Sequence, residues 1–296
     1  MCKHHIILYN ETVKTIGKIF FAVLLLYGVF YIALDEKEGE THVLRLSDRK
    51  IISFGQMIED LKKTRLVFVG EIHNQEFHHR QQTAIIKALH DSGIRVAVGF
   101  EMFTAESQDD LNGWVNGRLP LGDFVKIYYK NWGMPWPLYR DILLYIQENR
   151  VPAVGLNIPP GISEKVAAHG FSSLTAGEIG KLPPGISCTV DDRYMEFIRR
   201  AYSTHRDSKE FVHFCEAQVL WDKTMAWNLV EFIRNNGTGT VVVLAGTGHA
   251  WKRGIPDQVR ILSEKTDYKV ILPEVPDYIE PNNITSEDAD YILLER

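Results

Sequence analysis

A fourteen-residue stretch, VGEIHNQEFHHRQQ at positions 69–82, contains three histidines and two glutamates directly after an apolar run. Imidazole and carboxylate groups can ligate divalent metals or transfer protons near neutral pH. Within the stretch, Gly70-Glu71-Ile72-His73 has a counterpart much later in the chain, Gly246-Thr247-Gly248-His249. In each motif, glycine allows a sharp turn and a histidine follows three positions on. The repetition predicts that both histidines serve one site.

Glu101 adds a further carboxylate, in the segment GFEMF, which ends another apolar run. We predict a catalytic acid–base set of Glu71, His73, Glu101 and His249. The same region could instead hold a divalent metal, with His73, His249, Glu101 and His78 as the candidate ligands. The competing interpretation is structural: each histidine would be a core side chain bonded to the backbone, and Glu101 an ordinary ion-pair partner.

The segment after His73 has a helical pattern whose polar end could line this site. His78, Gln82, Ile85 and Leu89 follow one another at spacings of four, three and four, so they share one face of a helix. The later half of that face is typical of a core, whereas the earlier half carries histidine and glutamine. We therefore expect the start of the helix to form one wall of a crevice, with His79 on the ordinary surface. The alternative for His78 is a satisfied interior side chain.

The elements that would position these residues alternate between strand and helix patterns. Short, nearly unbroken apolar runs predict strands at 65–70, 94–100, 152–157, 240–245 and 268–272. Helical periodicity lies between them at 75–91, 137–149, 209–236 and 255–264. This order predicts an α/β fold with an open, mostly parallel sheet flanked by helices. Ligands of such sheets bind beyond the carboxyl ends of the strands, where both glycine–histidine motifs fall.

The first 34 residues differ from the rest, because Ile19–Leu34 is a sixteen-residue run without a charge. We interpret residues 1–34 as an N-terminal membrane anchor, a transmembrane helix, with a cleaved signal segment as the alternative. Lysines precede the run and acidic residues follow it, so the body of the protein would lie outside the cytoplasm, on the periplasmic side of the cell envelope. Residues 35–52 are interpreted as a polar tether.

The remaining chain is interpreted as one α/β domain at 53–275 with a C-terminal tail at 276–296. Two stretches between predicted strands, 104–136 and 160–215, are longer than a simple crossover connection needs. They predict a smaller helical subdomain inserted on the sheet. Within the tail, residues 289–294 could add an edge strand.

Composition narrows the classes of partner. The net charge is −5 and the basic residues are scattered, which argues against a nucleic-acid partner, since phosphate binding needs clustered lysine and arginine. With 45% hydrophobic residues, the chain can bury a substantial core. Cys188 and Cys215 could pair or remain as free buried thiols, because two cysteines do not define a disulfide framework.

Several segments together resemble the ChaN-like haem-binding uptake family of the Tiki/TraB/erythromycin-esterase-like superfamily. They span roughly 53–272 and read VGEIHNQEFHHRQQ, GFEMF, WPLYRDILLYIQENRVPAVGLNIP, FCEAQVLWDKTMAWNLVEFI and LAGTGHAWKRGIPDQV. The resemblance implies an α/β domain with a smaller helical one, and an envelope protein that binds haem for iron acquisition. It also allows a homodimer. Related proteins are often lipoproteins, but no lipobox cysteine follows the apolar run here.

The haem that the resemblance implies needs an apolar slot, an axial ligand and cations for its propionates. The aromatic segment around residues 128–136 is the candidate region, although a simple helix–sheet contact would explain it too. Our candidate axial ligands are Tyr129, Met134 and Tyr139. Lys130 and Arg140 are the candidates for the propionates.

Because the superfamily also contains hydrolases, a rival function follows from the same resemblance. The protein would then be an esterase-like or peptidase-like hydrolase, which activates water either with histidine and glutamate side chains or with a bound metal. The residues that match Glu71, His73, Glu101 and His249 would do this. A third option is a non-catalytic envelope scaffold. Whether the protein is an enzyme is thus left open by its sequence.

Overall fold

The computed structural model describes most of the chain, namely residues 41–159, 161–190, 192–201, 209–237 and 239–295. The predicted anchor or signal segment at 1–34 lies outside the described residues. Among the residues that are described, no helix is long and apolar enough to span a membrane. Residues His42–Glu295 form one compact unit.

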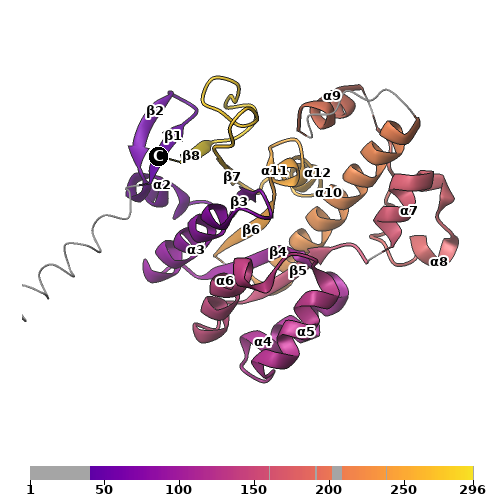
Figure 1. Ribbon diagram of the computed structural model, residues 1–296, viewed down its shortest axis with the longest axis horizontal. Helices are drawn as coiled ribbons and strands as arrows, with labels where there is room; N and C mark the ends of the chain where they lie inside the picture. The colour runs from indigo at the N-terminus through magenta and orange to yellow at the C-terminus, as the bar shows by residue number, and fades with distance from the viewer. Residues whose placement is uncertain (1–40, 160, 191, 202–208, 238, 296) are drawn as a thin grey trace, which may run out of the picture. The chain divides into compact units, whose positions relative to one another are not determined.

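One eight-stranded sheet, in the order β2-β1-β8-β7-β3-β6-β4-β5, organises this unit (Figure 1). Its parallel strands are β3 (Leu66–Glu71), β4 (Val96–Thr104), β5 (Ala153–Asn157), β6 (Thr240–Gly246), β7 (Tyr268–Pro273) and β8 (Tyr291–Leu294). The hairpin of β1 (His42–Arg45) and β2 (Lys50–Ser53) joins antiparallel to β8. The predicted α/β fold with a mostly parallel sheet is confirmed, and so are all five predicted strands.

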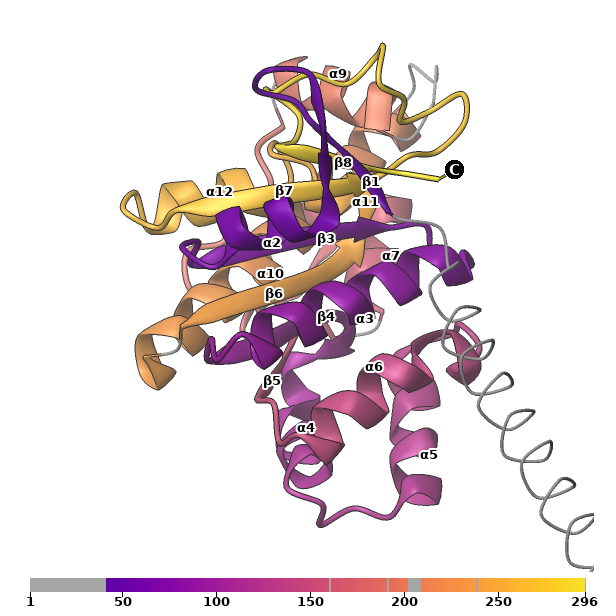
Figure 2. The same cartoon turned by 90° about the vertical axis from the view of Figure 1, so that its left-hand side faces the viewer.

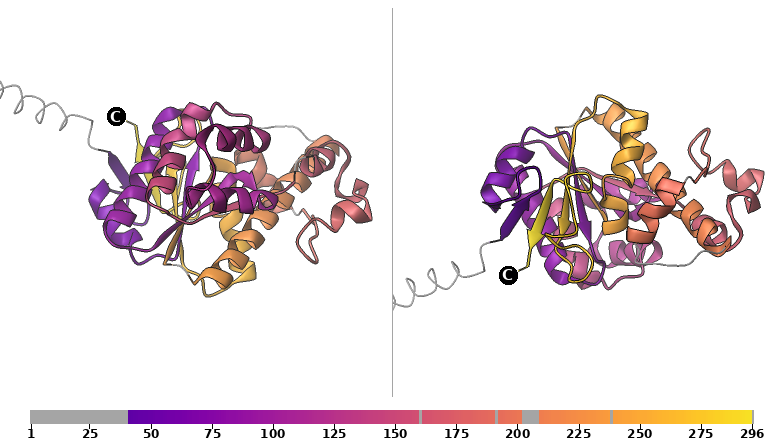
Figure 3. Two further views of the ribbon diagram at one scale, coloured as in Figure 1. Left: turned by 90° about the horizontal axis from the view of Figure 1, so that it is seen from below. Right: turned by 90° about the horizontal axis from the view of Figure 1, so that it is seen from above.

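Helices cover both faces of the sheet (Figures 2 and 3). Alternate residues of β3 separate the faces, since Val67 and Val69 belong to one hydrophobic cluster and Leu66 and Phe68 to another. The first cluster includes α2 (Phe54–Leu61), α3 (Glu76–Asp91), α4 (Gln108–Val115), α5 (Leu121–Asn131) and α6 (Trp136–Glu148). The second includes α9 (Asp192–Ala201), α10 (Lys209–Asn236), α11 (Thr247–Ala250) and α12 (Ile255–Leu262).

The strand order reverses between β3 and β6, which are neighbours in the sheet. The chain leaves β3 through α3 on one face and leaves β6 through α11 and α12 on the other. In open α/β sheets such a reversal marks the crevice where ligands bind, beyond the carboxyl ends of the two strands. The two glycine–histidine motifs lie there, at the ends of β3 and β6.

The prediction of a tether over 35–52 is wrong for its second half. Residues 42–53 form the β1–β2 hairpin, in which Val43 pairs with Ile52 and both side chains are buried. The hairpin was not predicted because each of its four-residue strands, HVLR and KIIS, has two adjacent apolar residues and therefore no alternation of apolar and polar positions. The strand predicted within residues 289–294 is β8. Because the hairpin pairs with it, β8 lies between β1 and β7 and is not at the edge of the sheet.

The two long helical stretches pack in different places. In the first, 104–136, α4 and α5 follow the short helix η1 (Ala105–Ser107) and bury side chains beside α3 and α6. The second holds η2 (Phe171–Ser173), α7 (Ile162–His169) and α8 (Ala176–Ile179), and its cluster packs on α10. They therefore do not form one subdomain. Cys188 and Cys215 are free and buried.

Candidate functional site

The two glycine–histidine motifs face each other across neighbouring strands, because Glu71 of β3 is in register with Gly246 of β6. Gly246 allows a close approach: a Cβ atom there would lie 2.9 Å from Cε1 of His73. Any larger residue would push the His73 ring out of place. The sheet thus brings the predicted pair of motifs together, and the second glycine makes room for the first histidine.

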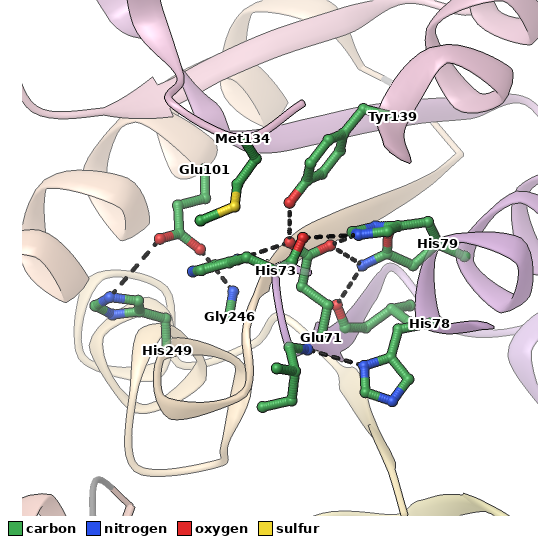
Figure 4. A network of polar contacts seen from close by, with 12 residues as sticks. Glu71, His73, His78, His79, Glu101, Met134, Tyr139, Gly246 and His249 are labelled. Atoms are coloured by element: carbon green, nitrogen blue, oxygen red, sulfur yellow. Dashed lines mark hydrogen bonds and ion pairs between the residues drawn. The ribbon is translucent and has the colours of Figure 1, made fainter. Parts of the chain in front are cut away.

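Glu71 is the centre of a buried polar network (Figure 4). Its side chain is fully buried, and four groups donate hydrogen bonds or charge to the carboxylate. His73 Nδ1 lies 2.8 Å from Oε1, and the hydroxyl of Tyr139 donates to the same oxygen. Gln82 Nε2 donates to Oε2 at 2.8 Å, and His79 Nδ1 lies 3.2 Å from it. A buried carboxylate with this many donors can stay ionised.

The network sets the charge of its members. Burial alone would raise the pKa of Glu71, but the hydrogen bonds from His73 and His79 outweigh it and hold that pKa well below its usual range. Burial likewise acts against protonation of His73, yet the bond to Glu71 and the charge of Glu101 raise its pKa to about 9. The pKa of His79 is raised despite burial, because Glu71 and the carbonyl of His73 accept from its two ring nitrogens.

A second chain of contacts holds the other motif. Nδ1 of His249 lies 2.7 Å from Asp222 Oδ1, and Tyr194 donates its hydroxyl to Asp222 Oδ2 at 2.9 Å. On the far side of the ring, Nε2 is 3.9 Å from Glu101 Oε1, too far for a direct hydrogen bond. Oε2 of Glu101 accepts the Gly246 amide at 2.6 Å. Although burial opposes it, the charge of Asp222 raises the pKa of His249.

The predicted catalytic set therefore comes together around Glu101. Figure 4 shows the Glu101 carboxylate between the His73 and His249 rings, with the Met134 side chain pointing into the same space. Each imidazole is oriented through Nδ1 by a carboxylate, Glu71 or Asp222, which fixes the position of the ring and favours its protonated form. His73 is 32% exposed, so this space can be reached from solvent.

The predicted metal set does not assemble in the same way. His78 turns away from the other three, and its Nδ1 accepts the amide of Ile72 at 2.9 Å. Burial lowers the pKa of His78 to about 4, which keeps the ring neutral. Within the described ranges, no group of three or more histidine, cysteine, aspartate or glutamate side chains is placed to hold a metal ion.

The haem candidates fall into two groups. Tyr139 is buried and its hydroxyl belongs to the Glu71 network, and Met134 faces the same interior. Tyr129 is instead 52% exposed at the end of α5, where its hydroxyl accepts the amide of Trp136 at 3.0 Å. Lys130 and Arg140 are exposed as well, and Arg140 pairs with Asp141 at 2.9 Å. The outer group offers an accessible phenol and two cations.

Two further residues, His79 and Asp222, belong to the site although neither is in the predicted catalytic or metal set. His79 was expected on the surface but is buried, because α6 covers the start of α3 and the Tyr139 ring lies 4.3 Å from the His79 ring. Asp222 comes from α10 on the opposite face of the sheet. The face that it shares with Gln218 in the segment FCEAQVLWDKTMAW already suggests from the sequence that both could reach the site, and the structure places Asp222 there.

Comparison with known proteins relates this chain to one protein family and its fold to solved structures. A family model described as "Haem-binding uptake, Tiki superfamily, ChaN" matches residues 57–259. The structure described as cofacial heme binding to ChaN of Campylobacter jejuni superposes with a TM-score of 0.68 at 20% identity, over 88% of this chain and 98% of that one. A mutant erythromycin esterase in its open conformation gives a TM-score of 0.45 at 14% identity, over 79% and 76%. No curated protein matches.

Proposed function

Because the chain belongs to the haem-binding uptake family of the Tiki superfamily that includes ChaN, we propose that it binds haem and serves haem or iron uptake or handling. The observation that carries the proposal is the family match over residues 57–259, which spans the whole crevice and the aromatic α5–α6 region.

We place the haem on the outer face of α5. Leu121, Val125 and Tyr129 follow at intervals of four and form a partly exposed apolar stripe along this helix. Leu121 is 50% exposed, an unusual fraction for a large apolar side chain on a helix that packs against a core. The Tyr129 phenol would ligate the iron, as tyrosine does in some haem proteins, and Lys130 would receive a propionate. Tyr139 is unsuited to ligation, since its hydroxyl is bonded to Glu71.

We extend the proposal to a homodimer and to an envelope location. The Campylobacter jejuni structure is described as cofacial haem binding, and an exposed tyrosine on a helix suits a haem that faces a second one across two copies of the chain.

The charge-free run Ile19–Leu34, with lysines before it, supports a membrane anchor with the domain on the periplasmic side.

A hemin titration of the purified full chain tests the haem site. The wild type should give a saturable shift of the Soret band. Tyr129→Phe keeps the ring but removes the ligand oxygen, so it should weaken binding by about tenfold or more. Tyr129→His should restore binding with a changed spectrum. Tyr145→Phe, a hydroxyl deletion on α6, is the matched control. A flat wild-type titration would contradict haem binding, and an unchanged Tyr129→Phe would move the site elsewhere.

A second candidate function, a hydrolase, is favoured by the 2.7 Å contact that orients His249 on Asp222. Here His249, in its neutral form, would accept a proton from water, and Glu101 would bind the attacked group or share the proton. His73, which its raised pKa keeps protonated near neutral pH, would act as the acid. Activity against a panel of esters and peptides, present in the wild type and lost in His249→Ala, would support it. If neither haem nor any substrate of the panel is bound, the non-catalytic scaffold becomes the better account.

A further inference from the structure

A cavity of about 470 Å³ lies at the end of the sheet opposite the crevice. It is formed where β4 and β5 begin, and Arg95, Arg150, Asn149, Asn236 and His90 line it. Both arginines precede strands: Arg95 comes directly before β4, and Arg150 lies between α6 and β5. None of these residues takes part in the Glu71 network or the α5 face, so this cavity is independent of the proposed function.

The two arginines of this cavity lack counter-charges. No hydrogen bond or ion pair joins either guanidinium to any side chain or backbone group of the described residues. Among those residues, the cavity wall itself holds no acidic side chain. The carboxylate at the end of α3, Asp91, is engaged by the Tyr145 hydroxyl at 3.3 Å and by His90 at 3.7 Å. Two exposed arginines without an internal partner among the described residues therefore line the same cavity.

Two other cavities contain an arginine that is paired with a carboxylate. In one, Arg200 pairs with Asp288, and Asp192 and Glu196 line the same wall. In another, Arg45 pairs with Asp48 at 2.8 Å. Arg200 and Arg45 are thus neutralised by carboxylates of the protein, and although Arg253 also lines the first cavity, three acidic residues line it too. The charges of Arg95 and Arg150 remain available to a ligand, on a chain whose net charge is −5.

Arg150 also occupies a backbone position that favours glycine. Its φ is +53°, in the left-handed region that directly follows the α6 helix, where glycine is the usual residue. Arg49 has a similar φ of +59°, but its guanidinium is bonded to the carbonyls of Ile284 and Pro281, which accounts for an arginine there. For Arg150 no such internal bond exists among the described residues. An unfavourable conformation kept at a cavity wall points to a role for the side chain.

We propose that this cavity binds the phosphate group of a small soluble molecule. Two guanidinium groups match the oxygens of phosphate. Asn149 and Asn236 also line the cavity, and each amide nitrogen donates one hydrogen bond to a helix carbonyl, of Tyr145 and Phe232 respectively, which leaves its second N–H for a ligand. The volume lies in the range of small-molecule sites. The site would give the protein a second ligand at the far end of the sheet from the crevice.

Calorimetric titration of the full chain with inorganic phosphate, at constant ionic strength, tests the proposal. The wild type should bind saturably. Arg150→Gly should weaken binding by about tenfold or more and at the same time raise the thermal midpoint, because glycine relieves the left-handed backbone. Arg95→Gln should weaken binding similarly without altering that backbone.

Arg234→Gln is the matched control, since it removes one positive charge from α10 at a side chain that pairs with Glu231 at 2.7 Å. It should leave phosphate binding unchanged. Absence of saturable binding in the wild type, or equal weakening by the Arg234 and Arg150 variants, would overturn the proposal. Haem binding to the Tyr129 variants is unaffected by either result, so the two proposals fail separately.

Discussion

At the scale of single residues, Glu71 shows how a charge is kept inside this protein. Its carboxylate accepts from Tyr139 and Gln82 and contacts His73 and His79, so every oxygen has two partners. Removing one member of such a network leaves the others buried without compensation, which costs more than the net gain of forming it. Glu71 is thus a structural centre as well as the group that orients His73.

Glu71→Gln should therefore lower the free energy of unfolding by about 3–5 kcal/mol. Glu76→Gln is the control, because Glu76 forms an exposed ion pair with Arg80 at 3.1 Å and should contribute no more than about 1 kcal/mol. Urea denaturation of both variants at neutral pH makes the comparison. Equal effects of the two substitutions would mean that the buried network contributes little.

The raised pKa of His73 makes stability depend on pH in the alkaline range. A histidine whose pKa is higher in the folded state contributes fully below its unfolded value, ~6.5, and the contribution is lost as pH rises through the folded value of about 9. The difference in unfolding free energy between wild type and His73→Gln should shrink between pH 6.5 and 9. A difference that stays constant or grows over this interval contradicts the assignment.

His78 should behave in the opposite way, in the acid range. Burial lowers its pKa to about 4, so the neutral ring contributes fully above the unfolded value of ~6.5, and this contribution is lost as pH falls through 4. The stability difference between wild type and His78→Gln should accordingly shrink on acidification from pH 6.5. Measuring both histidine variants on one pH series separates the two neighbouring effects.

At the scale of elements, the site depends on how closely β6 approaches the turn after β3. Gly246 is in register with Glu71, and His73 lies against it. The network on α3 and the Asp222–His249 pair from α10 and α11 meet only because β3 and β6 are neighbours. The distance between the turn after β3 and the turn after β6 is therefore set by the pairing of these two strands in the sheet.

Gly246→Ala should displace the His73 ring and destabilise the protein by about 1–3 kcal/mol, since the added methyl would sit 2.9 Å from Cε1. Gly122→Ala on α5 is the control, because no atom lies within 4 Å of a Cβ added there, and it should change stability by less than about 1 kcal/mol. Thermal unfolding compares them, and the ring signals of His73 in NMR spectra report its displacement.

At the scale of the whole molecule, the β1–β2 hairpin completes the sheet. It buries Val43, Leu44 and Ile52 and covers the side of β8 that β7 leaves free. Without the hairpin, β8 would present unpaired backbone groups, which are a template for aggregation. The second half of the predicted tether, residues 42–52, is thus part of the folded domain.

A chain that begins at residue 54 should therefore be several kcal/mol less stable than one that begins at 41, at ~1.5–3 kcal/mol for each buried side chain lost. It should also self-associate on size-exclusion chromatography. Ile51→Lys serves as the control, because Ile51 is 49% exposed on β2, so the substitution should change stability by no more than about 0.5 kcal/mol. A monomeric truncated chain with an unchanged thermal midpoint would show that the hairpin is dispensable.

The sequence alone determined five of the parallel strands, β3 to β7, together with the α/β class and the pairing of two glycine–histidine motifs at strand ends. These are local properties, since apolar runs and glycine turns record what each segment can do by itself. Only the tertiary structure decided which side chains meet. It placed Asp222 on His249, buried His79 under Tyr139, turned His78 away and separated Tyr129 from Tyr139. Such contacts depend on strand order and on which helix covers which face, and both arise from packing between segments far apart in the chain.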